Sequence, residues 1–250
     1  MDIKRLAVET AKKAGKLLKE RLGNAGPIEF KGAVDIVTEM DRLSEALIIG
    51  EIKKAFPDHG ILTEESAEII AKSPYRWIID PLDGTTNYSH GFPVFCVSIA
   101  FEQSGQCVFG AVYNPMLDEL FTAEKNNGAY LNGGKIWVSQ IKTLDKSLLA
   151  TGFPYDIRKT SETNLDHFSN FAVRAQAIRR AGAAALDMSY VACGRFDGFW
   201  EMKLKPWDVA AAALIVEEAG GKVSDFKGNA FSIYGNETLA TNGLIHDPML

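Results

Sequence analysis

The sequence predicts a mixed α+β fold, arranged as one continuous unit with two sheet layers. Three observations support this prediction. An amphipathic helical repeat opens the chain, short apolar segments separated by turn residues fill positions 94–133, and helical and strand-like segments alternate after about residue 147. Because no long flexible linker and no internal repeat interrupts the 250 residues, we expect a single domain over residues 1–250.

Two helices are expected in the first 60 residues. Apolar residues recur on one face over residues 3–22, which predicts the first helix. The second should begin near Thr38, where TEMD has the threonine-to-acid spacing of a capping box, and should end before Pro57. This places Asp41 in the first turn of the second helix.

Two short buried strands are expected next. Residues 61–62 form the first, which leads into the acidic pair Glu64 and Glu65. The second is the apolar run at 77–79, which is bounded by turn residues. It leads directly into DPLDG, so two aspartates are expected on the turn that leaves a buried strand. Charge at such a place is costly unless a partner compensates it.

The remaining elements follow from the same signals. VFCVSIAFE, CVFGAVYN, ELFTAEK and GAYLNG are expected to form an antiparallel meander, because SGQ, PMLD and NNG separate them. In the second half, SLLATGF, FDGFWE, KVSDF and TLATN are typical of strands. Helices are expected near 160–175, in AAALDMSYVACG and over 208–219.

Composition narrows the functional class. The formal net charge of −5 argues against a general nucleic-acid binder, which would usually show a basic patch. No apolar run approaches ~20 residues, so a membrane span is disfavoured, and the first helix lacks the apolar centre of a signal peptide. The three cysteines form no CxxC pair and fit small buried side chains in a reducing compartment. We expect a cytoplasmic protein with no membrane and no direct nucleic-acid partner.

Five acidic residues are the candidates for chemistry: Glu64, Glu65, Asp80, Asp83 and Asp208. Taken singly, each has an ordinary structural explanation as a turn residue, a solvated edge or a helix cap. Together they indicate a metal site. Asp80 and Asp83 lie three residues apart, and the proline between them stiffens the turn, so both carboxylates can point into one small space. Mg²⁺ prefers such hard oxygen ligands.

The next residues are suited to bind a phosphate group. Gly84, Thr85 and Thr86 open a short helix, and a helix N-terminus offers free N–H groups to an anion. The carbonyl of Leu82 is available in such a turn as a further metal ligand. Thr85 and Asp41 could orient and deprotonate an attacking water.

No arrangement typical of a covalent nucleophile is present, since the sequence has neither a GxSxG elbow nor a Cys–His pairing. Enzymes that form an aspartyl-phosphate use a DxD spacing of two, whereas the spacing here is three and includes a proline. The sequence therefore favours hydrolysis by a metal-activated water.

The segments DPLDGTTNYSHGFP and KPWDVAAAALIVEEAGG resemble the two signatures of the inositol monophosphatase family. VDIVTEMD and LTEES also match the family, at the expected places in chain order, and the resemblance covers nearly the whole chain. It implies a layered αβαβα sandwich of the inositol monophosphatase and sugar phosphatase type. It also implies a magnesium-dependent, lithium-sensitive phosphomonoesterase that is usually a homodimer.

The resemblance also assigns roles by position. Two or three Mg²⁺ ions per site, with Mn²⁺ as a possible substitute, would be held by Glu64, Asp80, the Leu82 carbonyl, Asp83 and Asp208. The resemblance implies that the attacking water is activated by Asp41, Glu64 and Thr85. The residues implied in substrate binding are Lys31, Asp83, Gly84, Thr85, Thr86, Gly182, Ala183, Glu201 and Asp208. Among them, Glu201 matches the residue that contacts sugar hydroxyls.

Within the family, RRAGAAALDMSYVACGRFDGFWEMKLKPWD resembles the bacterial inositol-1-monophosphatase branch. The expected substrate is therefore a myo-inositol monophosphate. Relatives with the same chemistry act on fructose 1,6-bisphosphate, nucleotide 3′-phosphates or NADP, and these stay open as alternatives. A third alternative is a transcription accessory protein that binds a partner and keeps a residual active site. Arg179 and Arg180 could serve the pocket, a partner or solvent alone.

The C-terminal residues HDPML read as the start of a helix, with Asp247 as the cap and Pro248 as the first helical residue. Family members usually continue into a helix there. We expect this helix to be short or truncated.

Overall fold

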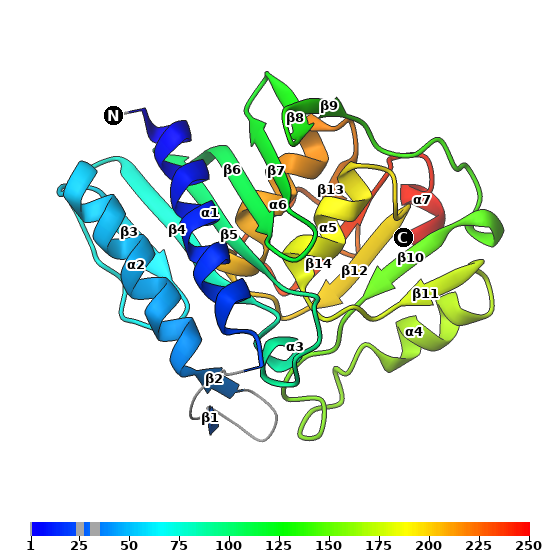
Figure 1. The fold of residues 1–250 in the computed structure, drawn as a ribbon. Coiled ribbons are helices and arrows are strands. Elements are labelled where there is room, and N and C mark those ends of the chain that lie inside the picture. The colour runs from blue at the N-terminus through cyan, green and yellow to red at the C-terminus, as the bar shows by residue number, and fades with distance from the viewer. Residues whose placement is uncertain (1, 24–27, 31–35) are drawn as a thin grey trace.

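The computed structural model describes residues 2–23, 28–30 and 36–250. Within them, the chain forms two larger sheets, a small antiparallel ribbon of β1 (Ile28–Phe30) and β2 (Ile36–Thr38), and the helices that cover the sheets (Figure 1). Among these residues, every helix is too short or too polar to span a membrane.

The larger sheet is the predicted meander, extended at both edges. Its strand order is β3-β4-β5-β6-β7-β8-β9. β3 and β4 run parallel, and every later pair is antiparallel. The strands are β3 (Gly60–Thr63), β4 (Tyr75–Asp83), β5 (Cys96–Gln103), β6 (Gln106–Asn114), β7 (Glu119–Glu124), β8 (Gly128–Leu131) and β9 (Gly134–Ile136).

The second sheet comes from the alternating half of the chain. Its order is β11-β10-β12-β14-β13; β11, β10 and β12 run parallel, and β14 is antiparallel to both of its neighbours. The strands are β10 (Leu148–Thr151), β11 (Ala177–Arg179), β12 (Gly198–Met202), β13 (Lys222–Ser224) and β14 (Glu237–Thr241). A 3₁₀ turn, η1 (Leu144–Lys146), precedes β10.

The helices form three layers around the two sheets (Figure 1). α1 (Ile3–Arg21) and α2 (Glu39–Ala55) cover the outer face of the larger sheet. α5 (Ala184–Ala192) and α6 (Pro206–Glu218) lie between the sheets. α4 (Leu165–Ala172) and α7 (His246–Met249) pack on the far face of the second sheet. The order αβαβα confirms the predicted fold class.

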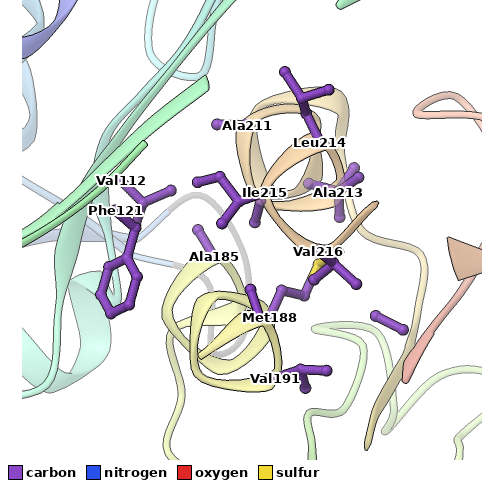
Figure 2. Close-up of a cluster of buried hydrophobic side chains, with 14 of the residues drawn as sticks. Val112, Phe121, Ala185, Met188, Val191, Ala211, Ala213, Leu214, Ile215 and Val216 are labelled. Carbon is purple, nitrogen blue, oxygen red and sulfur yellow. The ribbon is translucent and has the colours of Figure 1, made fainter. Parts of the chain in front are cut away.

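Three hydrophobic clusters hold these layers together, and strand alternation separates them. On β4, Trp77 and Ile79 belong to the cluster under α1 and α2, whereas Ile78 faces the central helices. On β12, Phe199 packs inward and Trp200 packs against the outer helices. Figure 2 shows the central cluster, in which side chains of the larger sheet meet those of α5 and α6. The central helices are thus fixed on both sides, which matters because both contribute to the site.

Two local predictions are wrong in detail, and a short strand was missed. The aspartates of DPLDG do not lie on a turn after the strand, because β4 continues to Asp83. Asp247 is not a cap: the short helix α7 begins at His246 and Ile245 is the N-cap residue. β11 was not predicted, because a strand of three residues, Ala177–Arg179, is too short to show an alternating pattern.

Candidate active site

The site begins at the end of β4, where the strand is irregular. Asp80 pairs with Ser98 and Asp83 pairs with Cys96, so β4 has one more residue than β5 between these pairs. Such a bulge redirects side chains at the end of a strand. The carbonyl of Pro81, within the bulge, accepts a hydrogen bond of 2.7 Å from Ser44 of α2. Asp80 and Asp83 consequently line one cavity of about 260 Å³.

Backbone amides orient the three aspartates of this cavity. Leu82 N–H donates to Asp80 Oδ1 at 3.0 Å. Asp83 receives the amides of Ala184 and Ala185, at 3.2 and 2.7 Å, and so ties β4 to the start of α5.

Asp208 is the third of these aspartates. It occupies the third position of α6 and accepts from Lys205 N–H at 2.7 Å. Asp208 therefore lines the same cavity as Asp80 and Asp83, although more than 120 residues separate it from them in the sequence.

The electrostatics of the cluster favour a cation. Burial raises the pKa of Asp80 well above its usual range, and the charges of Glu64, Asp83 and Asp208 add to the effect. Burial also raises the pKa of Asp83 to about 6 and that of Asp208 to about 7, although hydrogen bonds to backbone amides oppose this. Several acids that destabilise one another in a buried place are compensated when a divalent cation binds among them.

The donor set fits a hard divalent cation. The side chains of Glu64, Asp80, Asp83 and Asp208 and the residue Leu82 all line the cavity, and carboxylate and carbonyl oxygens are the ligands that Mg²⁺ prefers. In the conformation of the described residues, no group of three or more acidic, histidine or cysteine side chains is already gathered in metal-binding geometry. Both carboxylate oxygens of Asp83 accept amide hydrogen bonds, and Oδ1 keeps a second lone pair with which it can bind a cation.

A tight turn leads from β4 into the short helix α3 (Thr85–Ser89). Gly84 is its N-cap residue and has a φ of 99°, in the left-handed region that only glycine adopts without strain. A Cβ here would lie 2.9 Å from the carbonyl oxygen of Val94. Gly84, Thr85 and Thr86 all line the cavity. The backbone of this turn therefore approaches the space beside the carboxylates.

Thr85 connects the turn to a buried acid behind it. Its hydroxyl donates to Asp41 Oδ1 at 2.8 Å and lies 3.1 Å from the carbonyl oxygen of Leu82. Asp41 Oδ2 accepts from the amide and hydroxyl of Thr38 at 2.7 and 2.6 Å, which is the predicted capping box. Burial raises the pKa of Asp41. Asp41 is not among the residues lining the cavity, and the hydrogen bond from Thr85 links it to the cavity wall.

The opposite wall comes from the second half of the chain. Glu201 on β12 lines the cavity together with Gly182 and Ala183, which precede α5. Burial raises the pKa of Glu201 to about 8, and the nearby Arg180 acts in the opposite direction. Gly152 leaves room for this carboxylate, because a Cβ there would lie about 2.1 Å from Glu201 Oε1.

Most of the predicted site residues therefore line the cavity; the exceptions are Asp41, which bonds to the lining residue Thr85, and two further residues. Glu65 does not line the cavity; its amide donates to Glu45 at 3.0 Å. Lys31 lies outside the described residues. Sequence reasoning also missed Asp187, a buried acid of α5 that lines the cavity. Its signal was an aspartate inside the otherwise apolar run AAALDM.

The profile of the inositol monophosphatase family matches residues 2–249. The chain belongs to this family. An inositol-1-monophosphatase of Synechocystis is 46% identical over 98% of this chain and 86% of its own length. The Nus factor SuhB of Escherichia coli K12 is 43% identical, over 98% of this chain and 93% of its own.

Solved structures agree with this membership. An inositol monophosphatase from Anabaena superimposes with a TM-score of 0.90 at 43% identity, covering 98% of this chain and 92% of that one. Two further structures have lower identity and bind phosphorylated compounds. SaIMPase-II bound to inositol monophosphate is 26% identical, has a TM-score of 0.83, and covers 100% of this chain and 92% of its own. An IMPase/NADP phosphatase complexed with NADP and Ca²⁺ is 25% identical, has a TM-score of 0.87, and covers 99% of this chain and 93% of its own.

The family is generally metal-dependent, and the relatives named inositol monophosphatase indicate a phosphatase. The chain is accordingly a phosphatase of the inositol monophosphatase family. Which ester it hydrolyses, and with which metal, depends on the details of the cavity.

Proposed function

We propose that this chain is a Mg²⁺-dependent phosphomonoesterase that hydrolyses myo-inositol monophosphates. One observation carries the proposal: acids from three distant segments, Glu64, Asp80 with Asp83, and Asp208, line the same cavity as the hydroxyl-binding candidate Glu201. A bound divalent cation would neutralise the phosphate and lower the pKa of the attacking water.

The residues of the cavity have distinct proposed roles in binding the metal and the phosphate. Glu64, Asp80, Asp83, Asp208 and the Leu82 carbonyl are proposed as the metal ligands. The amides of the turn at 84–86 would hold phosphate oxygens on the side away from the aspartates, since this turn lines the cavity.

Thr85 and Asp41 are proposed to accept the proton of the attacking water. Because the Thr85 hydroxyl donates its hydrogen to Asp41, its oxygen lone pairs are free to accept from a water. Asp41 then takes the proton through Thr85, and burial, which raises the pKa of Asp41, makes it a better base than an exposed aspartate.

Glu201 would orient the leaving group by a hydrogen bond to one of its hydroxyls. Gly182 and Ala183 shape the wall beside it. The experiment is a panel of phosphate esters ranked by kcat/KM in the presence of Mg²⁺. We expect myo-inositol 1-phosphate at the head of the ranking. If the highest kcat/KM belonged to fructose 1,6-bisphosphate, a nucleotide 3′-phosphate or NADP, the proposed reaction would stand but the proposed substrate would be wrong.

A second candidate function is a role in transcription, which the name of the SuhB relatives favours. The net charge of −5 gives no support for direct nucleic-acid binding, so a protein partner is the form we consider. A catalytically inactive Asp208→Asn variant separates the two functions. If it restored growth fully in cells that lack the gene, recruitment of a partner would be the main role.

Three properties implied by the resemblance stay predictions: the homodimer, lithium sensitivity and the cytoplasmic location. Sedimentation equilibrium tests the first, and inhibition of phosphate release by Li⁺ tests the second. Fractionation of cells tests the third.

A further inference from the structure

One buried acid in the wall of the cavity, Asp187, has no role in the proposed reaction. Asp187 lies in the first turn of α5, where its amide donates to Ala183 at 3.0 Å. The residue is only 1% exposed, and its Oδ1 atom has no hydrogen-bond partner among the described residues. It nevertheless lines the cavity.

Folding alone does not account for this residue. A buried polar atom without a partner destabilises a protein, and few such atoms occur in native structures. The flanking residues Leu186 and Met188 of α5 belong to the central hydrophobic cluster, so Asp187 is a single acid in an apolar stretch of this helix. An unpaired acid in such a helix is explained when its partner is a ligand in the cavity.

The surroundings of Asp187 indicate what kind of ligand this is. The charged groups that act on it are Glu201, Asp83 and Arg180. Burial raises the pKa of Asp187 well above its usual range, the two acids add to this effect, and Arg180 opposes it. A protonated carboxyl both donates and accepts hydrogen bonds, and a hydroxyl group has the same two capacities. An anionic ligand atom is a poorer match beside two further acids.

We propose that Asp187 is a second hydroxyl-binding residue, which works beside Glu201 and selects phosphate esters with neighbouring hydroxyl groups over esters with none. The preferred ligands are therefore phosphates of polyols and sugars. This inference rests on the proposed function, because it assumes that the phosphate lies at the aspartate cluster and that the rest of the ester extends toward β12.

The experiment compares myo-inositol 1-phosphate with phenyl phosphate, whose leaving group has no further hydroxyl. Asp187→Ala removes the hydrogen-bonding group, and Asp187→Asn preserves it in a similar shape. Ser189→Ala is the matched control on the same helix: Ser189 is buried and bonds to Ala185 at 2.7 Å, but it does not line the cavity.

We expect Asp187→Ala to lower kcat/KM for myo-inositol 1-phosphate at least ~10-fold relative to phenyl phosphate, mainly through KM. Asp187→Asn should restore the preference to within about threefold. Ser189→Ala should leave the ratio of the two substrates unchanged. An equal loss on both esters after Asp187→Ala, or no loss on either, would overturn the proposal and leave the phosphatase assignment intact.

A binding measurement tests the inference about Asp187 separately from the proposed function. If the wild-type protein hydrolysed neither ester, the proposed function would fail. The shift in Tm caused by myo-inositol 1-phosphate would then decide the inference. A shift present in the wild type and lost in Asp187→Ala supports it, whereas the same shift in both proteins, or no shift in either, overturns it.

Discussion

Replacement of Glu201 by glutamine tests the electrostatics of the cavity through stability rather than through catalysis. Burial raises the pKa of Glu201 to about 8, from an ordinary value of 4.5. The folded protein therefore binds a proton at this site more tightly than the unfolded chain does. Glutamine has nearly the same shape as the protonated acid but does not titrate. The difference in unfolding free energy between the two proteins should consequently depend on pH.

The sign and size follow from linkage. A raised folded-state pKa gives stability that is fully present below about pH 4.5 and is lost as pH rises through about 8. Two pH units separate pH 6 from that folded pKa, and each unit corresponds to about 1.4 kcal/mol. Because Glu201 is partly open to solvent, screening reduces the effect. We expect the wild type to lose roughly 1–3 kcal/mol relative to Glu201→Gln between pH 6 and pH 9.

Urea denaturation of the metal-free proteins at the two pH values measures this difference. Glu20→Gln, at an exposed position of α1, shows how the same chemical change acts away from the cavity. A difference between wild type and Glu201→Gln that is the same at pH 6 and pH 9 would refute the reasoning. The cavity would then not penalise the charge of Glu201.

Further predictions concern the acids and the turn. Asp208→Asn keeps an acceptor for the Lys205 amide, so Tm of the metal-free protein should change little. Loss of a metal ligand should lower kcat/KM at least ~100-fold, since outer groups alone are worth 10–100-fold. Thr85→Val should remove most turnover, whereas Thr85→Ser should retain it, because only serine keeps the hydroxyl bonded to Asp41. Gly84→Ala should lower the unfolding free energy by about 1–3 kcal/mol in urea denaturation, because of the φ of 99°. Unchanged kcat/KM in Asp208→Asn, unchanged turnover in Thr85→Val, or an unchanged unfolding free energy in Gly84→Ala would contradict the respective role.

Asp83→Asn is a less informative variant than Asp208→Asn. Both oxygens of Asp83 accept hydrogen bonds from amides of α5, at 3.2 and 2.7 Å. An asparagine would place an NH₂ group against one of those N–H donors, so folding would suffer along with metal binding.

Local signals in the sequence were sufficient for much of the fold. The TEMD spacing predicted the capping box, and the structure confirms it with Thr38 and Asp41. The meander was also predictable, because alternation and turn residues are local properties. The extension of β4 through Asp83 was not, because a bulge depends on pairing with β5.

The site residues also differ in whether the sequence alone indicates them. The acids of DPLDG and the turn at Gly84 attracted attention because unusual residues stand close together in the sequence. Asp187 lies alone in an apolar helix, and its importance depends on the burial and missing partner that only the fold shows. Asp208 was a candidate only as one of five acids, since its sequence position alone also fits a helix cap, and the resemblance then placed it among the metal ligands.

The central claim is that acids from distant segments form a divalent-cation site for phosphate hydrolysis. Phosphate release from myo-inositol 1-phosphate by the metal-depleted protein, before and after addition of Mg²⁺, tests it most directly. We predict no release without metal, full activity on addition of Mg²⁺, and no recovery in Asp208→Asn. Turnover that persists after thorough removal of metal, or that is equal in the variant, would contradict the claim.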